Sequence, residues 1–175
     1  MRVLCKTILI GLLLASPVAA QPAIFVVRHA ERADAASSGA AMMAADPELS
    51  QAGRARAEAL AVLLEDANIT AIFTTEFKRT QQTAAPLAKE AGIQSTMIRA
   101  RDQATLVEAL KTATGNVLVV GHSNTVPSII KDLGVSTPVT LRDDEYDNLF
   151  IVIPAPALGE RSESKGARLL RLHFR

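Results

Sequence analysis

The sequence predicts an α/β fold, a three-layer α-β-α sandwich built on a mainly parallel sheet. Apolar runs of strand length alternate with segments whose apolar residues recur at helical spacing, and this alternation implies crossover connections between parallel strands. The run at residues 117–120 is apolar without interruption, as expected of a strand that is covered on both faces. The length of 175 residues suits one domain with a full core.

The first predicted strand is followed by a polar tip, a loop and a helix. Residues 23–27 are apolar and rich in branched side chains, and this strand ends at Arg28 and His29. Residues 34–46 are rich in Ala, Ser, Gly and Met and predict a loop over the strand end, either a substrate lid or a plain surface connection. Ser50 then caps a helix with one apolar face.

The middle of the chain repeats the strand-helix pattern twice. Residues 71–75 predict a second strand, and residues 78–91 predict a helix that Gly92 terminates. Residues 94–100 predict a short third strand, and a helix follows at about residues 104–114.

The last part of the chain completes the predicted sheet. The strand at residues 117–120 leads into a helix at residues 126–133, which Gly134 closes. Residues 149–153 and 169–173 predict two further strands, separated by a turn rich in Pro, Gly and charged residues.

Residues 1–20 have the pattern of a cleavable secretory signal. Arg2 and Lys6 form a basic start, an apolar run follows, and small residues precede Gln21. The apolar run is about half of the ~20 residues that a membrane-spanning helix needs, which favours a signal over an anchor. We predict an exported protein, periplasmic in a Gram-negative bacterium, with no stable membrane insertion after cleavage. Cys5 is the only cysteine and leaves with the signal, so no disulfide is expected.

Composition argues against nucleic acid and anionic membranes as partners. The formal net charge is +1, and removal of the signal leaves a nearly neutral chain, so there is no electrostatic basis for either interaction. Aromatic residues make up 3% of the chain and Trp is absent, which disfavours a stacking surface for single-stranded nucleic acid.

Four basic side chains are expected to meet at the carboxyl edge of the sheet. Arg28 and His29 follow the first strand, Arg79 lies just inside the helix after the second, and His122 follows the strand at residues 117–120. Guanidinium forks match phosphate oxygens, and a neutral imidazole held at one nitrogen can attack phosphorus with the other. The second imidazole can stabilise charge on an equatorial oxygen. The pattern therefore predicts a phosphate-binding site with a nucleophile.

Further residues near these segments are weaker candidates. Asn124 precedes a predicted helix, whose first amide groups can bind an anion. Arg32 and Glu76 either touch the substrate or form surface salt bridges. His173, near the C-terminus, is predicted to be structural.

The motifs around these residues resemble those of the histidine phosphatase superfamily, which also contains cofactor-dependent phosphoglycerate mutases. The matching strings are Val27-Arg28-His29-Ala30-Glu31, Leu49-Ser50 with Gly53, Thr74-Thr75 through Arg79-Thr80 to Gln82-Thr83-Ala84, and Val120-Gly121-His122-Ser123. The resemblance implies a phosphoglycerate mutase-like histidine phosphatase domain over residues 21–175. It also implies that His29 becomes phosphohistidine and that Arg28, Arg79 and His122 form the phosphate pocket.

Within this superfamily, the chain resembles small bacterial phosphohistidine phosphatases and the exported lipopolysaccharide core heptose phosphatases. The latter carry a similar Arg-His-Ala-Glu-Arg string, here at residues 28–32. The expected partner is a small phosphorylated substrate or an envelope phosphate group, and the expected reaction is hydrolysis of a phosphomonoester or phosphoramidate.

The sequence leaves the general acid open. Members of the acid phosphatase and phytase branch carry Asp after the second His, where this chain has Ser123. A proton donor for an alkoxide leaving group is worth roughly 10²–10⁴ in rate. The candidates are four carboxylates whose spacing does not decide between them: Glu31, Asp102, Glu108 and Asp144.

Three other functions are alternatives to a phosphatase. A catalytically silent binder of phosphorylated ligands would keep the site without turnover, although such a binder has no need of the His29 nucleophile. A metalloenzyme is disfavoured because the three His residues lack metal-ligand spacing, so no metal and no cofactor are expected. A mutase is disfavoured because the mature chain leaves little room for the insertions that hold a sugar phosphate.

Overall fold

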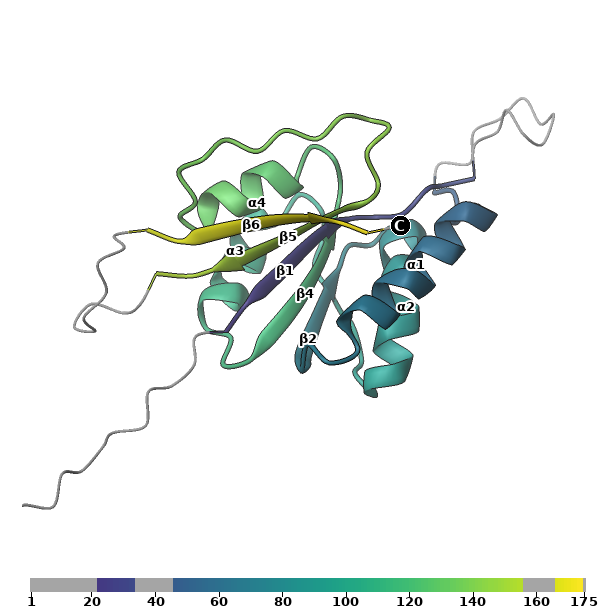
Figure 1. Cartoon of the computed structure of the whole chain (residues 1–175), viewed down its shortest axis with the longest axis horizontal. Helices are drawn as coiled ribbons and strands as arrows, with labels where there is room; N and C mark the ends of the chain where they lie inside the picture. Colours follow the sequence, from purple (N-terminus) through teal and green to yellow (C-terminus); the bar gives the residue numbers. More distant parts are fainter. Residues whose placement is uncertain (1–21, 34–45, 156–165, 175) are drawn as a thin grey trace, which may run out of the picture.

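The computed structural model describes residues 22–33, 46–155 and 166–174, and in these ranges a six-stranded sheet is covered by helices on both faces (Figure 1). The strands are β1 (Ile24–Arg28), β2 (Ile69–Thr74), β3 (Thr96–Met97), β4 (Asn116–Gly121), β5 (Asn148–Ile153) and β6 (Arg168–His173). The helices are α1 (Gln51–Leu64), α2 (Lys78–Ala91), α3 (Gln103–Lys111) and α4 (Val126–Asp132). The predicted signal at residues 1–20, and residues 34–45 of the predicted lid, lie outside the described ranges.

The sheet has the strand order β3-β2-β4-β1-β5-β6. The pairs β1–β4, β2–β4 and β2–β3 are parallel, whereas β5 is antiparallel to both β1 and β6. The strands and helices alternate from β1 to α4, so each parallel strand returns to the sheet through a helix. The predicted three-layer α-β-α sandwich with a mainly parallel sheet is confirmed.

The core consists of two apolar layers, one on each face of the sheet. Alternate residues of a strand point to opposite faces, so the same strand contributes to both layers. In β1, Phe25 and Val27 pack in the layer that contains α1 and α2, and Ile24 and Val26 pack in the layer that contains α3 and α4. Figure 1 shows α1 and α2 on one side of the strands and α3 and α4 on the other. This burial on both faces explains why the central strands are apolar throughout.

Most element boundaries agree with the sequence pattern, and the differences have local causes. Helix α2 has the predicted ends, and Gly92 follows it in the left-handed conformation with φ 66°. Strand β2 begins at Ile69, two residues before the predicted start, because Asn68 with φ 49° already turns the chain after α1. Strand β3 is limited to Thr96–Met97, at the edge of the sheet, where it has one neighbouring strand. No helix in the described ranges has the length and apolarity to cross a membrane.

Gly53 is required by the packing of α1 against the segment after β1. The Ser50 side chain caps α1 by accepting from the Gly53 amide at 3.0 Å, and the Ser50 amide donates to the Glu31 carbonyl at 2.8 Å. A Cβ atom on Gly53 would lie 2.1 Å from that same Glu31 carbonyl oxygen. The absence of a side chain therefore lets the residues after His29 lie directly on the helix.

We expect Gly53→Ala to destabilise the fold by about 1–3 kcal/mol, the usual range for overpacking. The clash is with backbone, which cannot rotate away as a side chain can. Urea unfolding of the wild-type and variant chains measures the effect, and Ala52→Gly, at the exposed neighbouring position, is a control for helix propensity. Equal stability of Gly53→Ala and the wild-type chain would contradict the close approach.

Candidate active site

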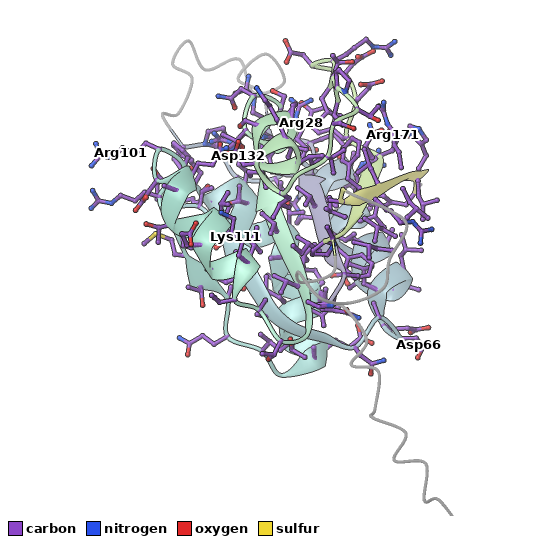
Figure 2. All side chains as sticks on the ribbon, turned by 90° about the vertical axis from the view of Figure 1, so that its left-hand side faces the viewer. Arg28, Asp66, Arg101, Lys111, Asp132 and Arg171 are labelled. Atoms are coloured by element: carbon purple, nitrogen blue, oxygen red, sulfur yellow. The ribbon has the colours of Figure 1, made fainter. Side chains whose placement is uncertain are left out.

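The parallel pairing of β1 and β4 brings the two predicted histidines together at the carboxyl edge of the sheet. Arg28 lies opposite Gly121 in the register, and the His29 amide donates to the Gly121 carbonyl at 2.9 Å. His122 follows Gly121 directly, and the rings of His29 and His122 are 5.3 Å apart between centroids in an edge-on arrangement. Figure 2 shows Arg28 at the end of the molecule opposite Asp66, which lies in the turn between α1 and β2.

His29 is buried and has one ring nitrogen held by the backbone. Its side chain is 5% exposed, and Nδ1 lies 2.7 Å from the Ala30 carbonyl oxygen. A carbonyl only accepts, so Nδ1 carries the hydrogen and Nε2 has the lone pair. Burial lowers the pKa of His29 to about 3, and the charges of His122, Arg79 and Arg28 add to this effect against the Ala30 hydrogen bond. The imidazole is therefore neutral, with Nε2 available as a nucleophile.

His122 is held on two sides by residues that follow β2. The Thr75 hydroxyl lies 3.2 Å from His122 Nε2 and 2.9 Å from the Thr80 hydroxyl. The Phe77 ring meets the imidazole edge-on, with centroids 5.3 Å apart. Burial lowers the pKa of His122 to about 4, and the positive charges of the arginines act in the same direction. His122 is thus also neutral near pH 7.

Arg28 links the site to the loop that precedes β5. Its Nη1 donates to the carbonyl oxygens of Arg142 and Asp143, both at 3.0 Å, and of Glu145 at 3.2 Å. The guanidinium carbon lies 4.0 Å from the centroid of the Tyr146 ring, and Nη2 donates to the Tyr146 hydroxyl at 3.3 Å. One edge of this guanidinium therefore orders the loop, which leaves Nε and part of Nη2 for another ligand.

Arg79 lies in the first turn of α2, beside the Phe77 ring, with its guanidinium carbon 4.3 Å from the ring centroid. Asp46 forms a salt bridge with Arg79 at 3.7 Å, and its carboxylate also accepts from the Lys78 amide at 3.0 and 3.2 Å. Asp46 thereby caps the start of α2 from outside the helix. This placement fixes Arg79 at the same sheet edge as the two histidines.

Two guanidinium nitrogens are buried without a hydrogen-bond partner. In the described ranges, the side-chain nitrogen and oxygen atoms in this state are Nε of Arg28 and Nε of Arg79. An unsatisfied buried donor is costly, and such atoms in a native fold call for a specific explanation. Both donors belong to the site that the sequence predicts for phosphate, and an oxyanion would satisfy them.

The two other predicted substrate-binding residues lie at the rim. Arg32 is exposed, forms a β-bridge with Leu49, and is close enough to Arg79 to lower its pKa, although burial is the larger cause. Asn124 is exposed in the turn between β4 and α4. The structure therefore brings Arg28, His29, Arg79 and His122 together and leaves Arg32 and Asn124 outside this group.

Each of the four predicted proton donors is engaged by another part of the fold. Glu31 forms a salt bridge with Arg56 at 2.6 Å, and the hydrogen bonds from Arg56 lower its pKa although burial acts to raise it. Asp102 caps α3 by accepting from the Thr105 amide at 3.3 Å. The other two are exposed: Glu108 pairs with Lys111 at 2.9 Å and Asp144 pairs with Arg142 at 3.0 Å. Within the described residues, none of the four forms a hydrogen bond or an ion pair with His29 or His122.

Sequence reasoning did not assign a role to Tyr146 or Thr75. Tyr146 is the only tyrosine in the chain and lies in a stretch that is otherwise polar and acidic. A single aromatic residue in such a stretch was the feature of the sequence that could have marked it as a site residue. Its ring lies 6.2 Å from the His29 ring. Thr75 was visible only as part of the family motif. The contact of each with the site depends on packing between distant segments.

The fold and the site together define a class of protein. A neutral imidazole with a free nitrogen lies beside two guanidinium groups whose Nε donors are unpartnered, at the carboxyl edge of a parallel sheet. Such an arrangement can bind an oxyanion and present a nucleophile to it. In the described parts of the chain, His, Cys, Asp and Glu side chains form no group of three that could hold a metal ion.

Comparison with known proteins gives a match to the histidine phosphatase superfamily over part of the chain. Residues 24–100 match the model of that superfamily, branch 1, which confirms the resemblance predicted from the motifs. This segment includes Arg28, His29 and Arg79, and the β1–β4 register adds His122. A search of curated protein sequences gives no significant match.

Solved structures with the same fold include several phosphatases. A protein from Agrobacterium tumefaciens described as a phosphohistidine phosphatase, SixA, has a TM-score of 0.59 and 21% identity over 86% of this chain and 97% of that one. The protein histidine phosphatase SixA complexed with tungstate has a TM-score of 0.60 and 17% identity, with coverages of 86% and 96%. The mycobacterial glucosyl-3-phosphoglycerate phosphatase with inorganic phosphate has a TM-score of 0.59 and 15% identity, with coverages of 75% and 89%. At these identities the likeness concerns the fold.

Proposed function

We propose that this protein is an exported phosphatase that hydrolyses a phosphomonoester or a phosphoramidate through a phosphohistidine intermediate on His29. The observation that carries the proposal is that two kinds of group lie at one site. His29 Nε2 is free to attack, and the Nε atoms of Arg28 and Arg79 have no hydrogen-bond partner. A site that only bound anions would need the guanidinium groups and not the oriented imidazole.

The geometry supports a reaction in two displacements. In the first, the Nε2 lone pair of His29 forms a bond to phosphorus, and the bond to the leaving oxygen or nitrogen breaks with its electron pair. The arginines neutralise the phosphoryl oxygens, and His122 stabilises the charge that develops on them. In the second, a water oxygen attacks phosphorus, the P–Nε2 bond breaks, and His29 regains its lone pair as phosphate leaves.

The names of two structural neighbours support phosphate as the group recognised. One neighbour is complexed with tungstate and another with inorganic phosphate, both tetrahedral oxyanions. Their names give a protein histidine phosphatase in one case and a glucosyl-3-phosphoglycerate phosphatase in the other. We include both phosphoramidates and phosphomonoesters in the proposed substrate class for this reason. An envelope phosphate group is the proposed natural partner, because it would be accessible to an exported protein.

Phosphoenzyme trapping tests the proposal. The chain from residue 21 onward is incubated with p-nitrophenyl phosphate, with phosphoramidate and with a panel of sugar phosphates, and is then quenched in alkali or in acid. We expect phosphate release and a phosphoenzyme that is stable in alkali and labile in acid, as a phosphoramidate bond on His29 requires. Binding of vanadate or phosphate without release from any member of the panel would instead favour the silent binder.

A further inference from the structure

Glu76 lies between the two residues that hold His122. It follows β2 directly after Thr75, whose hydroxyl is 3.2 Å from His122 Nε2. Phe77, on its other side, presents its ring edge-on to the same imidazole. The residues on both sides of Glu76 therefore form one wall of the phosphate site.

The carboxylate of Glu76 is fixed in position and open to water. Its Oε2 accepts from the Ala100 amide at 2.8 Å, which ties it to the connection between β3 and α3. The residue is exposed, so solvent reaches it. Its charge is close enough to His122 and Arg79 to raise the pKa of each, against the larger effect of burial. Glu76 is thus an anchored acid at the solvent side of the site.

Two other carboxylates near the site are engaged by a cation or by a helix end. Glu31 is paired with Arg56, and both oxygens of Asp46 accept from the Lys78 amide while Arg79 lies beside them. Glu76 has no salt-bridge partner in the described ranges. It can therefore exchange a proton without breaking an ion pair.

The protonation state of Glu76 suits a base. Burial acts to raise its pKa, but the hydrogen bond from the Ala100 amide and the charge of Arg99 act in the opposite direction, and the pKa lies below its ordinary value. The group is ionised at neutral pH. Hydrolysis of a phosphohistidine requires such a base, because the attacking water must lose a proton as it bonds to phosphorus.

We propose that Glu76 is the general base that takes a proton from the water that hydrolyses the phosphohistidine. The inference rests on the proposed function. As the water oxygen bonds to phosphorus, the P–Nε2 bond breaks, its electron pair returns to His29, and one water proton moves to the Glu76 carboxylate. The proton passes to solvent when phosphate leaves.

Stopped-flow kinetics with p-nitrophenyl phosphate isolates this step, because the leaving group departs as p-nitrophenolate and needs no proton donor. Glu76→Gln keeps an oxygen that accepts from the Ala100 amide and loses the basicity. We expect a burst that approaches one p-nitrophenol per enzyme, followed by turnover about 10²-fold slower than wild type, within the range for general-base loss. The trapped phosphohistidine should rise to match the burst. The matched control is Glu90→Gln, an exposed glutamate in the last turn of α2, which should behave as wild type.

The outcomes separate the inference from the proposed function. Formation of phosphohistidine by wild type, with Glu76→Gln turning over at the wild-type rate, overturns the role of Glu76 alone. Equal slowing of the burst and of the later turnover would assign Glu76 a structural role and also overturn it. A wild-type chain that never forms phosphohistidine overturns the proposed function and this inference with it.

Discussion

Replacement of His29 by asparagine is expected to stop turnover and leave oxyanion binding intact. The asparagine amide can donate to the Ala30 carbonyl as Nδ1 does at 2.7 Å, so the buried hydrogen bond is kept. The lone pair that attacks phosphorus is lost. We expect kcat to fall by about 10⁴-fold or more, the scale on which enzymes respond to removal of a covalent nucleophile. Phosphatase assays and phosphoenzyme trapping measure the loss.

Two further measurements make this result specific. Calorimetric titration with vanadate should give a similar affinity for wild type and His29→Asn, because the guanidinium groups with unpartnered Nε remain in place. His173→Asn is the matched control, since His173 is exposed on the edge strand β6 and pairs with Asp147 at 3.3 Å. Retention of the phosphoenzyme by His29→Asn would place the nucleophile elsewhere.

The sheet, and the position of the four basic side chains at one edge of it, could be predicted from the sequence. The strand-helix alternation predicts parallel neighbours, and parallel strands end at one edge. Arg28 and His122 are separated by more than 90 positions in the chain, yet the β1–β4 register places Arg28 opposite the glycine that precedes His122. Residues distant in the chain therefore meet because of the strand order, which the local strand and helix patterns predict.

The hydrogen-bond and salt-bridge partners of the site residues could not be predicted from local sequence patterns. Arg28 is held by three backbone carbonyls of the loop before β5, and a carbonyl has no residue-type signal in a sequence. The salt bridge of Glu31 with Arg56 joins residues whose spacing fits no helical or strand periodicity. Carboxylates therefore could not be sorted into paired and available groups until the packing was known, and Glu76 emerged from that sorting.

The two neutral imidazoles should make the protein lose stability as the pH falls below about 6.5. In the unfolded chain, His29 and His122 take up protons near the ordinary pKa of 6.5, but burial lowers the pKa of His29 to about 3 and that of His122 to about 4 in the fold. At pH values between the lowered pKa of each histidine and its ordinary pKa of 6.5, the unfolded state binds more protons than the folded state. The free energy of unfolding therefore rises with pH in this range. The contribution of the two histidines to it decreases as the pH falls.

For His122 alone, the loss between pH 7 and pH 5 should be about 2 kcal/mol, because one pKa unit corresponds to 1.36 kcal/mol. Urea unfolding of wild type, His122→Asn and the double variant with His29→Asn, at both pH values, measures it. We expect each substitution to flatten the pH dependence, the double variant most. Glu31 does not interfere, since its pKa lies below its ordinary value of 4.5 and its contribution is lost only at lower pH. A parallel loss of stability in all three chains would show that the two imidazoles take up protons equally in the folded and unfolded states, and would contradict their lowered pKa values.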